Sequence, residues 1–161
     1  MSIGSSRNVL FQHAIRNFVG EPLCKFMANW LVGGIMIAIE RNGCILHTER
    51  YEDCVRFYRD IVGLRLEFEK NEPAQTLSIL DFGGAYLMIE RGGLASAAPK
   101  TATQNPVTIR FNVVDIDEAV AQLRSKGLNV HASRFEWGTI ADFTDPDGNP
   151  CQLREAASFA R

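Results

Sequence analysis

The feature of this sequence that most limits its fold is a pattern of predicted elements that occurs twice. Short apolar runs predict strands, and apolar residues at helical spacing that end at a glycine predict a helix. In the first copy, one strand, one helix and three strands are predicted at 44–48, 51–62, 64–69, 77–82 and 85–90. In the second copy, the same order is predicted at 107–113, 116–126, 128–132, 139–143 and 151–155. The duplication predicts an α+β fold built from two βαβββ modules.

Glycine-rich breaks separate the predicted elements at matching places in the two copies. Gly63 and Gly127 follow the predicted helices, as glycine does at helix ends, and Gly83-Gly84 is typical of a tight hairpin. Residues 92–105 are rich in small and turn-forming residues and are predicted to link the copies. We therefore predict one domain at 42–158, with modules at about 43–91 and 106–156.

The residues before this domain, 1–41, form a predicted N-terminal extension with an apolar pattern of its own. Apolar residues follow a loose helical spacing over 8–19, and a second helix is predicted over 23–32. We expect a helical extension that packs on the domain or on a partner chain. Two alternatives remain open at this point: translation that starts at Met27 or Met36, and a membrane-surface helix, which the absence of a basic face disfavours.

Charge, hydropathy and cysteine spacing exclude several classes of protein. The chain has 17 basic and 19 acidic residues and a net charge of −2, which disfavours nucleic-acid binding. The apolar run at 26–39 is too short to cross a bilayer, and no signal-peptide cleavage site follows it, so we expect a cytoplasmic protein. No two cysteines have C-x-x-C spacing, which argues against a zinc knuckle or a thioredoxin-like motif; the cysteines are Cys24, Cys44, Cys54 and Cys151.

Three short motifs carry a resemblance to a known superfamily. They are FYRDIVGL at 57–64, FNVVDID at 111–117 and DPDGN at 145–149. With these motifs the chain resembles the vicinal oxygen chelate superfamily, which includes glyoxalase I, bleomycin-resistance proteins and extradiol dioxygenases. The resemblance implies that the two modules form a curved mixed sheet around a cavity.

The resemblance also implies where a metal would be bound. In the metal-dependent members, His, Glu or Gln ligands come from the first and last strands of each module. By position, these four slots fall on Gly43, Leu87, Thr108 and Gln152, and a shift of one residue exchanges Leu87 for Met88. A divalent ion needs several converging N, O or S ligands, which this set does not supply. We therefore expect no metal cofactor.

Strand alternation predicts which other side chains share the face of these slots. In the first module they are Ile45, His47 and Ile89; in the second module, Arg110, Asn112 and Arg154 join Gln152. Trp137 lies just before a strand of the second module, where its ring could stack on a flat ligand. The candidate ligand-binding residues are therefore His47, Arg110, Asn112, Trp137, Gln152 and Arg154.

Each candidate also has a structural interpretation. Two arginines suit a carboxylate or another anion, because a guanidinium matches planar oxyanions. They could equally form structural ion pairs with Glu49, Glu90, Asp142 or Glu155. His47 could act as a base or as a donor to a ligand, or could simply be bonded to a backbone carbonyl. Trp137 could instead seal the sheet edge.

These observations favour a metal-free protein that binds a small organic molecule, with anions included among the candidate ligands. The main alternative is a metal-dependent lyase, isomerase or dioxygenase with displaced ligands such as His47, Glu90 and Gln152. A third possibility is a protein that mainly dimerises or binds another protein, with a filled cavity. Whether the chain is an enzyme is open at this point. We expect a homodimer, because modules of this kind leave sheet edges that a partner can cover.

Overall fold

The computed structural model describes residues 39–73 and 75–158. Contacts divide the chain after Ile39, and residues 40–161 form one compact unit. The helical extension predicted for 1–41 lies outside the described residues, apart from its last three positions. In the described part of the chain, no helix has the length and apolar character needed to span a membrane.

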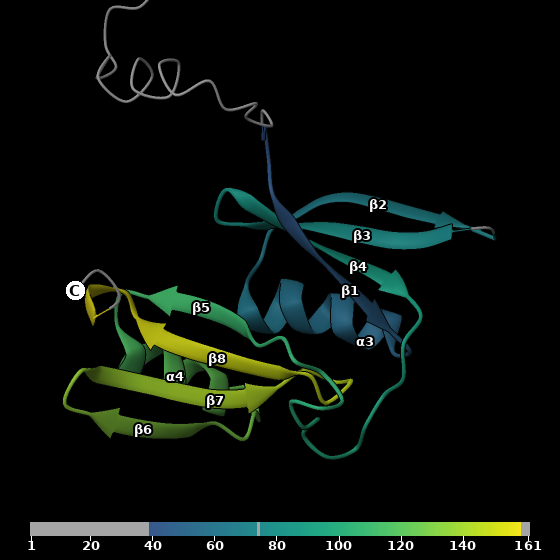
Figure 1. The fold of residues 1–161 in the computed structure, drawn as a ribbon. Coiled ribbons are helices and arrows are strands. Elements are labelled where there is room, and N and C mark those ends of the chain that lie inside the picture. The colour runs from purple at the N-terminus through teal and green to yellow at the C-terminus, as the bar shows by residue number, and fades with distance from the viewer. Residues whose placement is uncertain (1–38, 74, 159–161) are drawn as a thin grey trace, which may run out of the picture. The chain divides into compact units, whose positions relative to one another are not determined.

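The first module is a four-stranded mixed sheet, and one helical segment covers one of its faces (Figure 1). The strand order is β1-β4-β3-β2, with β1 parallel to β4 and the other neighbours antiparallel. The elements are β1 (Gly43–Thr48), α3 (Tyr51–Arg56), the π-helical turn η2 (Phe57–Val62), β2 (Leu66–Glu72), β3 (Gln75–Phe82) and β4 (Ala85–Arg91).

The second module repeats this topology. Its strand order is β5-β8-β7-β6, with β5 parallel to β8, and α4 covers one face. The elements are β5 (Ile109–Val113), α4 (Ile116–Ser125), β6 (His131–Phe135), β7 (Gly138–Thr144), β8 (Pro150–Glu155) and the short 3-10 turn η3 (Ala156–Ser158). The predicted α+β fold with two βαβββ modules is confirmed. Among the described strands the two sheets share no hydrogen-bonded ladder, so a cavity enclosed by both stays a prediction.

The bounds of several predicted elements differ from the structure by a few residues, and two of the differences have a visible cause. The helix predicted over 51–62 is α-helical only in its first half, and Gly63 closes the π-helical half with φ 93° and an amide bonded to the carbonyl of Tyr58, five residues back. The strand predicted from 128 begins at His131, because the preceding residues stay attached to the end of α4. The amide of Leu128 donates to the carbonyl of Leu123, and Arg124 Nη2 donates to the carbonyl of Val130 at 2.8 Å.

A common apolar core joins the modules. Phe57 contacts Phe143, with ring centroids 6.3 Å apart, and Phe82 contacts Phe111 at 5.4 Å. Leucine and isoleucine side chains from the helix-covered faces of both sheets belong to the same buried cluster. Burial of apolar surface stabilises a fold by about 25 cal/mol per Å². Because both copies of the repeat contribute to one core, each copy depends on the other for part of this stabilisation.

The DPDGN turn at 145–149 is a polar junction between the modules. Tyr58 of the first module donates a 2.9 Å hydrogen bond to Asp145 Oδ2. The Asp147 carboxylate accepts the backbone N–H groups of Glu49 and Arg50, at 2.9 and 3.1 Å, immediately before α3 begins. The segment predicted as a linker also bonds to this turn, because the amide of Ser96 donates to the carbonyl of Asp147 at 2.9 Å. The turn therefore holds the two residues that immediately precede a helix of the other module.

Candidate functional site

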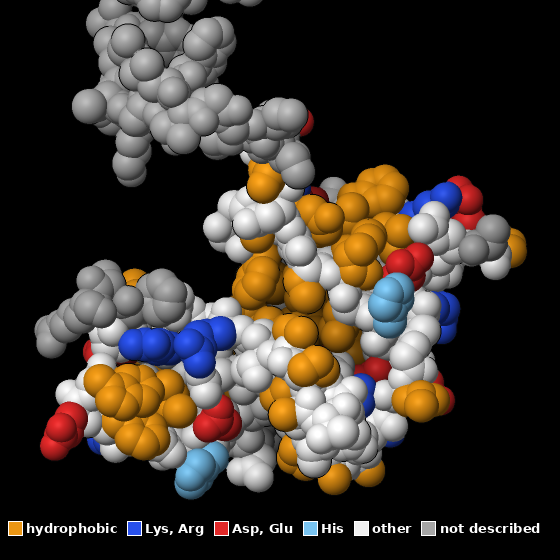
Figure 2. Space-filling view, in the orientation of Figure 1, with side chains coloured by type: hydrophobic (Ala, Val, Ile, Leu, Met, Phe, Trp, Pro, Cys, Tyr) orange, Lys and Arg blue, Asp and Glu red, His pale blue; other side chains and the backbone are white. Residues whose placement is uncertain are grey.

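Each sheet has one face covered by its helix and an opposite face, which we call the open face. Residues directly across from one another in neighbouring strands share a face, so the strand register defines its members. On the first sheet, one row of the open face is apolar and comprises Ile45, Met88, Ile79 and Phe68. The next row comprises His47, Glu90, Leu77 and Lys70. Figure 2 shows hydrophobic side chains gathered over this sheet.

The structure corrects the predicted face of strand β4. Leu87 and Ile89 were expected beside His47, but both are fully buried on the helix-covered face, where they pack with Leu46. Met88 and Glu90 take their places on the open face. The physical reason is strand alternation counted from the hairpin: the pairs Phe82–Ala85 and Asp81–Tyr86 set a register one residue away from the predicted one.

On the second sheet, the strand register brings four candidate residues to one open face. Arg110 lies opposite Gln152, and Asn112 lies opposite Arg154. The row through Gln152 continues to Asp142 on β7 and His131 on β6. The first sheet presents an apolar row at the corresponding place, so the two open faces differ in chemistry.

Gln152 is the most buried polar member of this face. Its side chain is only 8% exposed, and its Nε2 donates a 2.7 Å hydrogen bond to Asp142 Oδ1. The amide oxygen, Oε1, is buried and has no hydrogen-bond partner among residues 39–73 and 75–158. A carboxylate can only accept at this distance, so the amide is oriented with its nitrogen towards Asp142 and its oxygen away from it.

An aromatic pair lies beside Arg154. The rings of Phe135 and Trp137 stack with centroids 4.8 Å apart, and they are 48% and 51% exposed. The Arg154 guanidinium carbon is 5.1 Å from the Trp137 ring centroid, within the range of a cation–π contact. Arg154 Nη2 also donates to the carbonyl of Ser158 at 2.9 Å. Arg154 and Trp137 therefore form a positioned pair at one end of the open face.

Arg110 and Asn112 are exposed on β5. Arg110 forms no ion pair or hydrogen bond with another residue in the described part of the chain, so the ion pairs considered for it from sequence are not made there. Its positive charge is therefore available on the same face as Gln152.

His47 lies on the other sheet and belongs to a different group of side chains. It is exposed, and its Nδ1 lies 3.9 Å from Glu90 Oε2. Glu90 Oε1 also accepts a 3.3 Å hydrogen bond from Gln75. His47 thus has a carboxylate neighbour on the open face of the first sheet, while the other five candidates belong to the second module.

The four metal slots implied by the family do not fit a metal in this chain. Leu87 points into the core, and a side chain at Gly43 would come within 2.5 Å of the Tyr86 ring, which fills the space above that position. Among the described residues, no three His, Cys, Asp or Glu side chains lie close enough together to hold a metal ion.

The described cysteines are poor nucleophiles. Burial raises the pKa of Cys54 and of Cys151 to about 12, and burial also raises the pKa of Cys44 above its usual value. The thiolate is the reactive form, so these thiols are inert near neutral pH. Asp145 beside them has a raised pKa, mainly because it is buried, and Tyr58 has a pKa well above its usual range for the same reason.

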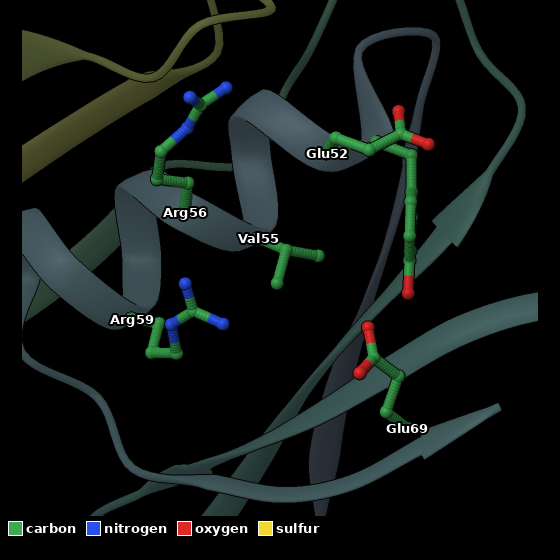
Figure 3. Close-up of a pocket in the computed structure, with 6 residues that line it drawn as sticks. Glu52, Val55, Arg56, Arg59 and Glu69 are labelled. Atoms are coloured by element: carbon green, nitrogen blue, oxygen red, sulfur yellow. The ribbon is translucent and has the colours of Figure 1, made fainter. Parts of the chain in front are cut away.

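A pocket that the sequence did not predict lies on the other side of the first sheet, between its helix and the edge strand β2. Its volume is about 350 Å³, and Figure 3 shows side chains from the helix and Glu69 of β2 around it. Its two arginines, Arg56 and Arg59, already pair with Asp53 and Asp60. The lining residues are Tyr51, Glu52, Val55, Arg56, Arg59 and Glu69. Nothing in the sequence pattern distinguishes them from a solvated helix face.

The fold and the two open faces define a class of small α+β proteins with paired βαβββ modules. Residues 42–153 match the family described as the Glyoxalase/Bleomycin resistance protein/Dioxygenase superfamily. The chain belongs to this superfamily, and the resemblance inferred from the three motifs is confirmed. No curated protein matches the chain.

Several crystal structures share the fold at low sequence identity. The antibiotic-binding protein TnmS3 from Streptomyces sp. CB03234 has 21% identity and a TM-score of 0.58, and the match covers 74% of this chain and 98% of that one. A superfamily member from Sphaerobacter thermophilus DSM 20745 has 23% identity and a TM-score of 0.57, covering 75% and 99%. Lactoylglutathione lyase from Agrobacterium tumefaciens has 20% identity and a TM-score of 0.56, covering 74% and 94%. One fold therefore serves a binding protein and a lyase.

Proposed function

We propose that this protein binds a small organic anion on the open face of its second sheet, without a metal ion. The observation that carries the proposal is the position of Arg110, which is exposed beside the buried Gln152 and has no ion-pair partner in the described chain. An exposed guanidinium next to oriented polar groups is suited to a carboxylate or another planar oxyanion.

The other candidates have complementary roles in this proposal. Arg110 binds the anionic group, and Asn112 on the same strand supplies an amide beside it. Trp137, held by Phe135 and Arg154, offers a half-exposed ring surface for the apolar part of the ligand. His47 remains a proposed contact from the first sheet.

Two further observations support binding over metal-dependent catalysis. The positions that hold a metal elsewhere in the superfamily carry a buried leucine and a glycine covered by a tyrosine ring. TnmS3, a fold relative, is an antibiotic-binding protein, which is consistent with a receptor role for this fold.

The test is a thermal-shift screen of organic acids on the full chain, followed by calorimetry of the acids that bind. We expect binding to persist in the presence of a chelator and to weaken about tenfold or more in Arg110→Ala, since hydrogen bonds to charged groups contribute about 1.5–3 kcal/mol. Arg134→Ala is the matched control, because Arg134 lies on the same sheet but pairs with Asp117 of α4.

Two results would contradict the proposed function. One is binding that disappears with the chelator and returns with added metal. The other is equal affinity of Arg110→Ala and Arg134→Ala for every acid that binds the native chain.

A further inference from the structure

We propose that Gln152 makes the site selective for aromatic acids that carry an O–H or N–H donor near the anionic group. This inference rests on the proposed function and specifies the class of ligand. The Gln152 amide oxygen, held away from Asp142 and left without a donor, is the feature that requires such a group.

The orientation of the Gln152 side chain follows from its bond to Asp142. The 2.7 Å contact joins the amide nitrogen to a carboxylate oxygen, and a flip of the amide would place two acceptors against each other. The free end of the amide is consequently a fixed hydrogen-bond acceptor. A ligand that meets it must donate.

The energetic argument comes from burial. A buried acceptor without a donor has lost its hydrogen bonds to water and gains none in return. A ligand hydroxyl or N–H that reaches Oε1 supplies a hydrogen bond, whereas an otherwise identical ligand without the donor leaves Oε1 unpaired. Sites of this kind discriminate strongly against the analogue that lacks the polar group.

The positions of the neighbours set the spacing of the ligand's groups. Arg110 is directly opposite Gln152 on the adjacent strand, and adjacent strands lie about 4.8 Å apart. The anion and the donor must therefore be close neighbours on the ligand. Because Oε1 is buried, the atoms that cover it must move when a ligand reaches it. Arg110 is exposed and makes no hydrogen bond in the described chain, so its side chain can change position.

The aromatic requirement comes from the far end of the same face. Arg154 follows Gln152 by two positions on β8 and shares its face, and the Trp137 ring lies 5.1 Å from the Arg154 guanidinium. Trp137 and Phe135 are both about half exposed, so a flat ring can be placed against them. Hydroxylated aromatic carboxylates combine all three features.

The experiment compares benzoate with 2-, 3- and 4-hydroxybenzoate by calorimetry on the full chain. We expect at least one hydroxybenzoate to bind about tenfold more tightly than benzoate, the fold-change that one recovered hydrogen bond gives. In Gln152→Met, which keeps the side-chain length but removes the acceptor, this preference should disappear, so that benzoate and the hydroxybenzoates bind with the same affinity. Asp142→Ala leaves the acceptor present but no longer fixed, and should reduce the preference.

The outcomes separate this inference from the proposed function. Equal binding of benzoate and all three hydroxybenzoates to the native chain overturns the selectivity but leaves anion binding intact. A preference that survives in a folded Gln152→Met, with folding checked by its melting temperature, also overturns it. If none of the four acids binds while another organic acid binds through Arg110, the selectivity for aromatic acids is rejected and the anion site stands.

Discussion

Tyr58 and Asp145 show how one residue pair links the two modules. The Asp145 carboxylate is buried and accepts the Tyr58 hydroxyl, the Asn149 side chain and the backbone amides of Asp147 and Asn149. Burial raises the pKa of this carboxyl, while the hydrogen bonds oppose that rise. The free energy of unfolding therefore depends on whether the Asp145 carboxyl is protonated.

We expect Tyr58→Phe to destabilise the protein by about 1–3 kcal/mol at pH 7, because it leaves a buried carboxylate with one donor fewer. Removal of that donor raises the folded-state pKa of Asp145 further and leaves the unfolded value unchanged. The extra loss of stability should therefore be small at acid pH, where Asp145 is protonated, and should grow as pH rises through its pKa. Urea unfolding between pH 3 and 8 measures this.

Tyr51→Phe is the control for this pH dependence. The Tyr51 hydroxyl is also buried, but it bonds to the neutral Ser78 hydroxyl at 2.7 Å. Its loss should cost a similar amount at every pH in that range. Parallel pH profiles for the two variants would contradict the role assigned to the Asp145 charge.

At the scale of the elements, the starts of the two α-helices in the described part of the chain are held in different ways. Helix α4 is capped locally, because Asp115 accepts the Glu118 amide at 2.9 Å, three residues along the chain. Helix α3 has no side-chain cap of its own, and Asp147 from the other module accepts the two amides that precede it. Only the first kind of cap is visible in local sequence.

This difference predicts unequal effects of two alanine substitutions. Asp115→Ala should cost about 1 kcal/mol, the usual value of a lost N-cap. Asp147→Ala should cost about 2 kcal/mol or more, because it removes a fully buried carboxylate that accepts two amides. The Glu49 amide then loses its acceptor, and the Arg50 amide keeps only its 3.1 Å bond to Thr48 Oγ1. Chemical denaturation of both variants measures the difference, and an effect of Asp147→Ala no larger than that of Asp115→Ala would contradict this prediction.

The sequence predicted the elements well because the signals for them are local. Within residues 39–73 and 75–158, alternating apolar runs and glycine breaks located the eight strands and the two α-helices, with shifts at β6 and at η2 where main-chain bonds near the helix ends decide the path. It also predicted the face of β8, since Gln152 and Arg154 fall in phase with Arg110.

The face of β4 was predicted incorrectly because register depends on the hairpin. One residue of slip exchanges Leu87 for Met88, and both are apolar, so composition does not reveal the error. The bond between Gln152 and Asp142 was also not predicted, because it depends on pairing between β7 and β8 and on burial. Asp142 could have been found by extending the alternation one strand further.

At the scale of the whole molecule, the open face of the first sheet is notably apolar. Ile45 and Phe68 are 48% and 52% exposed at opposite ends of one row. An exposed apolar row on a sheet face favours contact with another surface. This is the part of the molecule on which the expected homodimer would depend.

We expect the native chain to be a dimer and Phe68→Glu to shift it towards monomer, because a buried charge without a partner opposes association. Light scattering coupled to size-exclusion chromatography gives the mass of each form. Val114→Glu is the control, since Val114 is almost fully exposed in the turn before α4. A native chain that is monomeric at micromolar concentration would contradict this prediction.

The bonds made by Asp147 have a consequence for the first repeat taken alone. In a fragment that contains only this repeat, the Glu49 amide would lose its acceptor, because that carboxylate belongs to the second repeat. The Arg50 amide would keep only its bond to Thr48 Oγ1. The isolated repeat would therefore start its helix from a less firmly held turn than it does within the full chain.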